Sequence, residues 1–282
     1  MASAATLPVP HLDARLFGAR RLSALTDEAL FERTGVRIAF TCRAGGVSEG
    51  PYAALNLGGH VGDGPASVER NRALVLEALD AADVPLVVPS QVHGDEIVEV
   101  ASAEPGAVEA ARARALEGAD GLLVDVPQVA ALLCFADCVP VIAVSPTGRF
   151  AVAHAGWRGV ENGVAAKAVR ALARADAAEL GEDAASGYNV YVGPHIHASC
   201  FETGADVRKR FEDRFGSSCI PDERHVDLLE ALTVGLEEAG IDRARVADAG
   251  VCTACSCDEF FSYRAAGGIC GRHGAVAFRK AG

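Results

Sequence analysis

Two patterns of hydrophobic and polar positions alternate along this chain. Continuous apolar runs, such as residues 129–136, have the length of strands that are buried on both faces. Between these runs, apolar positions recur at the spacing of one helix face, as they do over residues 160–177. The alternation predicts an α/β protein with a mixed β-sheet core flanked by helices.

The expected elements follow from the same pattern. Ser67 is the predicted N-cap of its helix, and residues 85–92 and 96–100 are predicted to pair as strands around a turn at 93–95. Residues 104–118 fit either a surface helix or a long loop. The other predicted strands are 36–42, 121–125, 129–136, 138–145, 149–156, 188–194 and 274–280, and the predicted helices are 64–84, 160–177, 205–215 and 225–240.

The chain shows no composition shift or flexible linker that would divide it. We therefore expect a single domain over residues 1–282, with residues 1–15 as a loose N-terminal tail. Every apolar run is far shorter than the roughly 20 residues that a membrane-spanning helix needs. The N-terminus also lacks the basic and apolar regions of a secretory signal.

Charge and cysteine usage narrow the classes of partner. The formal net charge is −12 and no Lys/Arg run is present, which argues against binding to nucleic acid or to an anionic membrane. Nine cysteines, an odd number, are scattered along the chain. This usage is typical of a reducing compartment, so we expect a cytoplasmic protein. The oligomeric state stays open.

Three short segments carry the strongest chemical signal: SQVHGD, CFADCVP and AVAHAGWRG. They contain His93, Cys138 and His154, and each resembles the end of a strand. Two imidazoles and one thiolate with an open fourth position are typical of catalytic zinc. Copper binds the same donors and is the alternative metal. The three segments together predict a metal site that performs chemistry.

Each segment taken alone also has a plainer interpretation. His154 fits a buried, hydrogen-bonded histidine beside a core Trp157, and Cys138 fits an inert buried thiol. His93 fits a polar hairpin turn, in which Gln91 shares its face because strand side chains alternate. The occurrence of all three at strand ends favours the metal site.

Other polar residues are candidates for substrate binding. Arg158 lies in a turn that leads into a helix, where backbone N–H groups attract anions. Arg43 lies in a glycine-rich loop without the spacing of a nucleotide-binding motif, and Asn71 lies on the helix that follows. Near the C-terminus, Arg264 and Arg272 are candidates to close the active site.

Two further motifs contain metal-binding residue types. The C-x-x-C-x-C spacing of Cys252, Cys255 and Cys257 suggests a second metal site, but no matching C-x-x-C pair is present. His195 and His197 form an H-x-H pair, which we interpret as surface histidines.

The ordered motifs TCRAGGVS, SVERNR, SQVHG, GADGLLVD, ADCVPV, AHAGWRG, VGP and the late FFSYR and GR span residues 40–278. Together they resemble the YfiH-like laccase-domain family, whose members are also labelled multicopper polyphenol oxidase, peptidoglycan editing factor and purine nucleoside phosphorylase. The resemblance implies a single α/β domain and metal ligands at His93, Cys138 and His154. It implies a substrate site that includes Arg43, Asn71, Gln91, Arg158 and Arg264.

The resemblance also implies an activity. We expect a zinc-dependent phosphorylase that cleaves adenosine- or inosine-type nucleosides with phosphate, with adenosine deaminase as a side activity. Arg43, Asp137 and Cys138 are the expected catalytic residues. Asp137 is a candidate proton acceptor, or a carboxylate that orients a ligand histidine.

Three other functions are kept as alternatives. A zinc amidase that edits peptidoglycan precursors would use the same open metal site. A copper-dependent phenol oxidase fits less well, because its copper centres require roughly ten histidines and the chain has 8. A non-enzymatic protein with zinc as a structural staple is disfavoured by the open coordination position.

Overall fold

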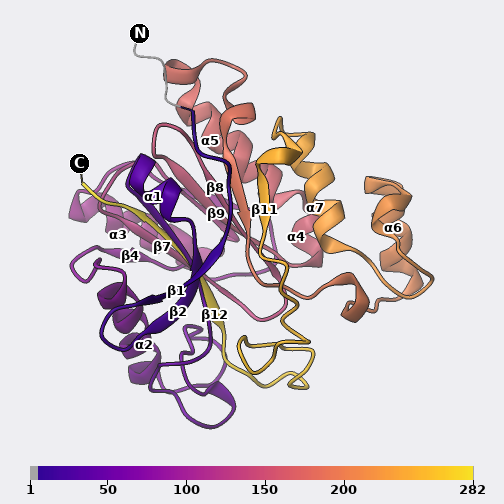
Figure 1. Ribbon diagram of the computed structural model, residues 1–282, viewed down its shortest axis with the longest axis horizontal. Helices are drawn as coiled ribbons and strands as arrows, with labels where there is room; N and C mark the ends of the chain where they lie inside the picture. The colour runs from indigo at the N-terminus through magenta and orange to yellow at the C-terminus, as the bar shows by residue number, and fades with distance from the viewer. Residues whose placement is uncertain (1–5, 282) are drawn as a thin grey trace.

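Two six-stranded mixed β-sheets form the centre of this computed structural model, which describes residues 6–281 (Figure 1). The first sheet has the order β1 (Asp13–Phe17), β2 (Leu22–Thr26), β3 (Val36–Thr41), β12 (His273–Arg279), β7 (Ala130–Phe135), β4 (Leu86–Val87). The second has the order β11 (Val246–Asp248), β10 (Asn189–Val192), β8 (Val139–Val144), β9 (Phe150–Ala155), β6 (Gly121–Val124), β5 (Ile97–Val100). Within residues 6–281, parallel pairing occurs only at the edges of the two sheets. The parallel pairs are β4 with β7, β5 with β6, and β10 with β11.

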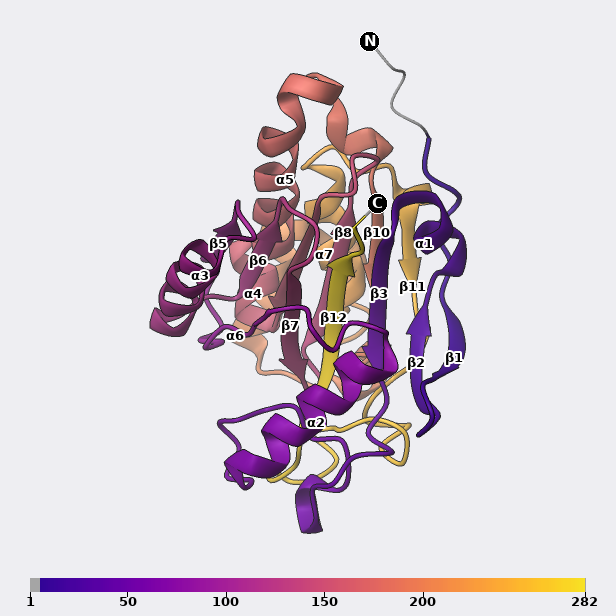
Figure 2. The same cartoon turned by 90° about the vertical axis from the view of Figure 1, so that its left-hand side faces the viewer.

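Helices cover the outer faces of both sheets. The helix α2 (Pro65–Ala78) crosses the outer face of the first sheet (Figure 2). The outer face of the second sheet packs against α4 (Trp157–Asn162), α5 (Val164–Leu180), α6 (Ala205–Phe215) and α7 (Leu228–Glu237). The helix α1 (Glu28–Thr34) packs against β3, and the helix α3 (Pro105–Glu117) packs against β4 and β5. The expected mixed-sheet core flanked by helices is confirmed, and it consists of two sheets.

The strand β7 shows why its sequence is apolar throughout. Leu133 and Phe135 point into the core between the two sheets, whereas Leu132 and Cys134 point towards α2. Successive strand side chains face opposite sides, so a strand between two apolar layers has no exposed face that would favour polar residues. Within residues 6–281, no helix is both long and apolar enough to cross a bilayer.

Two connections cross from the first sheet to the second at the same end of the structure. Residues 136–138 join β7 to β8, and residues 88–96 join β4 to β5. The prediction that 85–92 and 96–100 pair as strands is therefore wrong, because β4 pairs with β7 and β5 pairs with β6. His93 has φ +60°, so the segment bends there and is not extended.

Other boundaries also differ from the expectation. The helix predicted over 160–177 is two helices, because Gly163 adopts φ +74° between α4 and α5. The N-cap of α2 is Gly64 rather than Ser67, since Pro65 occupies the first helical position. Of the two alternatives for residues 104–118, a surface helix or a long loop, the structure shows the helix, α3.

The expectation of a loose tail over residues 1–15 is wrong for its later part. Leu7 is buried in the core between the sheets, and Asp13 begins β1. The backbone oxygen of Pro8 accepts hydrogen bonds from Asn189 and Arg245, which hold this segment in place. Residues 1–5 of the predicted tail lie outside the described residues.

A buried histidine makes stability depend on pH. His273 on β12 is fully buried between the rings of Phe135 and Phe260, and burial lowers its pKa to about 3. In the unfolded chain the ordinary pKa is about 6.5. Between these two values the unfolded chain binds a proton that the folded chain excludes, so stability falls as the pH falls through this window.

We expect the substitution His273→Leu to reduce the loss of unfolding free energy between pH 7 and pH 5. Urea denaturation at the two pH values measures this loss. The wild-type protein at the same two pH values is the reference. An equal pH dependence in the two proteins would contradict the assignment.

Candidate metal centre and active-site pocket

The side chains of His93, Cys138 and His154 meet where the chain crosses between the sheets. Their donor atoms all lie within 4.8 Å of one another. The Nε2 atom of His93 is 3.9 Å from the Sγ atom of Cys138, and tetrahedral zinc would place such atoms about 3.6 Å apart. The donor set and spacing fit a metal ion with three protein ligands.

Local backbone geometry brings these donors together. His154 on β9 follows Phe150 and Val152 at alternate positions, so its ring points into the space between the sheets. Asp137, with φ +89°, turns the chain sharply from β7 towards Cys138. Gly156 must lack a side chain, because a Cβ atom there would lie 2.8 Å from Cδ2 of His93 and 3.1 Å from Sγ of Cys138.

The carboxylate of Asp120 orients two of the three donors. It accepts a hydrogen bond from Nδ1 of His154 at 2.7 Å, which leaves Nε2 of that ring for a metal. It also accepts hydrogen bonds from the backbone N–H groups of Val92, His93 and Gly94 at 2.6–3.1 Å. Burial raises the pKa of Asp120, but these bonds and the charge of His154 lower it below the ordinary value.

The pKa values of Cys138 and His154 shift in opposite directions because the two side chains interact electrostatically. Burial by itself raises the pKa of the Cys138 thiol, yet the imidazoles of His154 and His93 lower it to about 6. Burial by itself lowers the pKa of His154, but the Cys138 thiolate and the Asp120 carboxylate raise it to about 9. A metal ion that binds here must therefore displace the proton of His154, so its affinity increases with pH.

The three donors form one wall of a cavity of about 420 Å³. His93 is the exposed member of the set, so the centre opens into this cavity. Polar and charged side chains line part of the cavity, and aromatic and apolar side chains line the rest. Besides the donors, the lining residues are His60, Gln91, Cys134, Ala136, Asp137, Trp157, Ile196, Phe201, Leu228, Tyr263, Arg264 and Arg272.

Comparison with known proteins identifies the family. The sequence model of the multi-copper polyphenol oxidoreductase laccase family matches residues 37–280. The chain belongs to this family. Purine nucleoside phosphorylase YlmD of Geobacillus stearothermophilus is 34% identical to it over 84% of this chain and 88% of that protein. A purine nucleoside phosphorylase of Bacteroides thetaiotaomicron is 31% identical over 92% of this chain and 94% of that protein.

Solved structures show the same fold. The crystal structure of YlmD from Geobacillus stearothermophilus aligns with a TM-score of 0.78 at 30% identity, covering 95% of this chain and 100% of that chain. The crystal structure of the hypothetical protein YfiH from Bacillus licheniformis aligns with a TM-score of 0.79 at 29% identity, covering 91% and 96%. The expected YfiH-like family and fold are therefore confirmed.

Gln91, Asp137 and Arg264, three of the expected site residues, line the cavity. The side-chain amide of Gln91 bonds to both the backbone N–H and the carbonyl of Cys134 at 2.8 Å. The Asp137 carboxylate accepts hydrogen bonds from the Thr253 hydroxyl and from the Arg264 backbone N–H. Asp120, rather than Asp137, therefore binds the ring of His154, and the expected role of Asp137 as a proton acceptor stays a prediction.

Arg43, Asn71 and Arg158 are not among the residues that line the cavity. The Arg43 guanidinium binds the carbonyls of Ala53 and Cys257, so it holds two loops together. Asn71 is fully buried, and its amide hydrogen-bonds to the loop before α2. Arg158 is exposed over the ring of Trp157. Each of these side chains is directed to a structural partner or to solvent, and the substrate contacts expected of them stay a prediction.

Two important site residues were not identified from the sequence. His60 lines the cavity, but it lies in a glycine-rich loop without a recognisable motif. Asp120 is fully buried, and its place in the GADGLLVD motif, directly before the apolar strand β6, is the signal that could have indicated a buried carboxylate that needs partners. The interpretation of His195 as a surface residue was also wrong, because it is 1% exposed.

We expect Asp120→Asn to weaken zinc binding by about 10- to 100-fold, because the amide cannot hold both the His154 ring and the 92–94 backbone as the carboxylate does. Competition against a chromogenic chelator measures the affinity. Asp137→Asn is the matched control, since Asp137 contacts Thr253 and Arg264 rather than a donor. Equal zinc affinity of the two variants would contradict the role of Asp120.

Proposed function

We propose that this chain is a zinc-dependent purine nucleoside phosphorylase that cleaves adenosine- and inosine-type nucleosides with phosphate. Adenosine deamination would be a second activity of the same centre. The observation that carries the proposal is the cavity itself, which joins the His93, Cys138 and His154 donors to arginines and aromatic side chains. Its volume of about 420 Å³ lies in the range of small-molecule sites, and the named relatives are purine nucleoside phosphorylases.

The apolar part of the cavity suits a purine base. Trp157, Phe201 and Tyr263 present aromatic rings, and Ile196 and Leu228 add aliphatic surface. Purines stack on aromatic side chains and gain from removal of their faces from water. We therefore assign the base to this part, with the ribose towards the metal donors.

The cationic part of the cavity suits phosphate. Arg264 and Arg272 both line it, together with His60. Burial lowers the pKa of His60, and the positive charges of Arg272 and His154 lower it further. These positive charges around His60 favour the binding of an anion. Arg264 and Arg272 take the phosphate-binding role that we expected of Arg43 and Arg158.

The chemistry divides between the metal and the chain. When zinc is bound by His93, Cys138 and His154, it supplies a Lewis acid that polarises an oxygen atom, or a water of lowered pKa for deamination. The cavity holds phosphate next to the anomeric carbon, so that the new bond to oxygen forms as the bond to the purine breaks. Asp137 is the proposed proton acceptor at the cavity wall.

Two further observations bear on metal and compartment. Among residues 6–281, two groups of donors are close enough to share an ion, and each has three members. Multicopper oxidases need roughly ten imidazoles, many more than these groups supply. This arrangement favours one catalytic zinc over phenol oxidation. All nine cysteines are free thiols, which supports our proposal of a cytoplasmic enzyme.

We expect the purified protein to release hypoxanthine from inosine only when phosphate is present, and to convert adenosine to inosine without phosphate. Cys138→Ser should stay folded, lose the metal and lower both rates at least about 100-fold, because a metal ion contributes several kcal/mol to such reactions. Chromatography of the purine products measures both rates. A metal-loaded, folded protein that releases no hypoxanthine would exclude phosphorolysis.

Arg272→Ala should raise the KM for phosphate by about 10- to 100-fold, since charge-assisted hydrogen bonds contribute about 1.5–3 kcal/mol each. The KM for nucleoside should change much less. Arg243→Ala is the matched control because its guanidinium pairs with Glu230 and Glu237 and is not among the residues that line the cavity. Steady-state kinetics with phosphate varied would show the difference, and an equal effect of the two substitutions would argue against this phosphate site.

A further inference from the structure

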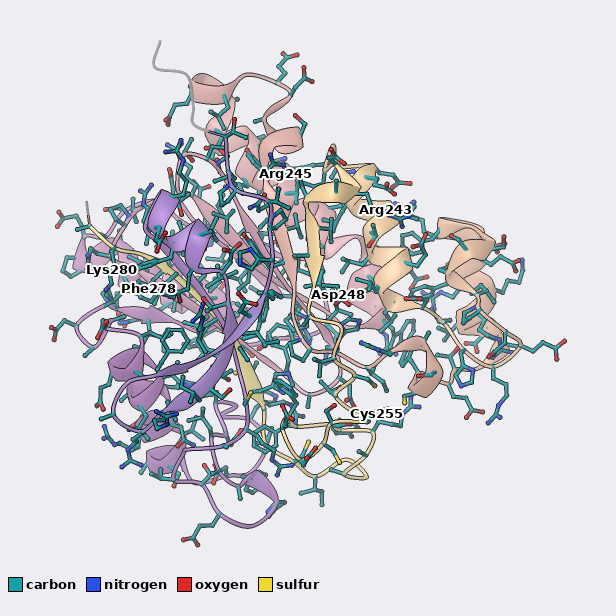
Figure 3. All side chains as sticks on the ribbon, in the orientation of Figure 1. Arg243, Arg245, Asp248, Cys255, Phe278 and Lys280 are labelled. Carbon is teal, nitrogen blue, oxygen red and sulfur yellow. The ribbon has the colours of Figure 1, made fainter. Side chains whose placement is uncertain are left out.

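A second group of thiols lies outside the centre described above. The Sγ atoms of Cys200, Cys252 and Cys255 all lie within 4.8 Å of one another, and the Cys200 and Cys255 sulfurs are 3.5 Å apart. Cys200 ends a short turn after β10, whereas the other two belong to the loop between β11 and β12, where Figure 3 labels Cys255. We name this group the cysteine cluster.

The spacing of the cysteine cluster matches a metal ion better than a set of unrelated thiols. Zinc with three thiolate ligands at about 2.3 Å would place the sulfurs about 3.8 Å apart. Cys252 and Cys255 stand in the C-x-x-C spacing that lets one turn supply two ligands. Cys255 is exposed, so a water molecule can reach the fourth position.

The surrounding backbone is suited to a thiolate. The Sγ atom of Cys252 accepts a hydrogen bond from the backbone N–H group of His197 at 3.4 Å. Such donors partly neutralise the charge on a metal-bound sulfur and fix its direction.

We propose that Cys200, Cys252 and Cys255 bind a zinc ion that is separate from the ion of the His93 centre. Soft thiolate ligands select zinc over magnesium or calcium. A disulfide between Cys200 and Cys255 is the competing state, but their sulfurs are well beyond the bond length of about 2.05 Å and Cys252 would then have no role.

The position of the cysteine cluster would let this zinc connect two segments of the cavity wall. Phe201, next to Cys200, lines the cavity, as do Tyr263 and Arg264 of the C-terminal loop. The Arg264 guanidinium already donates hydrogen bonds to the carbonyls of Cys200 and Glu202, at 2.9 and 3.3 Å. Zinc on the cysteine cluster would add a second link between these two segments of the cavity wall.

Metal content of the purified full-length protein, after saturation with zinc and removal of the excess, tests the proposal. We expect about two zinc ions per chain in the wild type, about one in Cys255→Ser and in Cys138→Ser, and none in the double variant. Cys257→Ser is the matched control and should keep both ions, because this exposed thiol is on the same loop but outside the cluster.

Cobalt provides an independent spectroscopic measurement. In Cys138→Ser the His93 centre has no thiolate, so a sulfur-to-cobalt charge-transfer band would report the cysteine cluster alone. Added zinc should also raise the Tm of Cys138→Ser but not that of the Cys138→Ser/Cys255→Ser double variant. Because neither readout involves turnover, failure of the proposed phosphorylase activity would not affect them.

Two outcomes would overturn the proposal. One is a wild-type protein and a Cys255→Ser variant with the same zinc content and the same cobalt spectrum. The other is a mass spectrum of protein purified without oxygen that shows a Cys200–Cys255 disulfide, because the oxidised sulfurs could not bind zinc.

Discussion

One buried carboxylate joins the two parts of the candidate metal centre. Asp120 holds the His154 ring on β9 with one interaction and the backbone of residues 92–94 with three others. The segment that carries His93 has no strand pairing of its own at this point. The carboxylate therefore replaces a β-ladder as the source of its geometry, and its own burial is compensated by the four hydrogen bonds it accepts.

The site depends equally on how the chain moves between the sheets. Cys138 lies on a three-residue connection between β7 and β8, and His93 lies on the connection between β4 and β5. Both connections leave the first sheet at one end, so donors that are 45 residues apart come within 3.9 Å. The sharp turn at Asp137 and the missing side chain at Gly156 provide the space that these donors need.

Arginines serve two purposes around the cavity. Arg264 and Arg272 bind backbone carbonyls with their guanidinium groups and also line the cavity. A guanidinium has five N–H donors, so one edge can hold a loop while another faces a ligand. Arg43 differs because its donors are directed to the carbonyls of Ala53 and Cys257. It joins the loop that contains Ala53 to the loop that contains Cys257.

Apolar runs and residue chemistry determined much of this protein from the sequence alone. They indicated the α/β class, the buried strands such as β7 and β8, and the three donors, because local pattern and ligand chemistry do not depend on the rest of the fold. The division of the strands into two sheets was decided by tertiary packing, since pairing partners are distant in sequence. Tertiary packing also decided what Asp120, His60, Arg43 and Asn71 contact. The partners of a side chain are those that the folded chain brings within hydrogen-bonding distance.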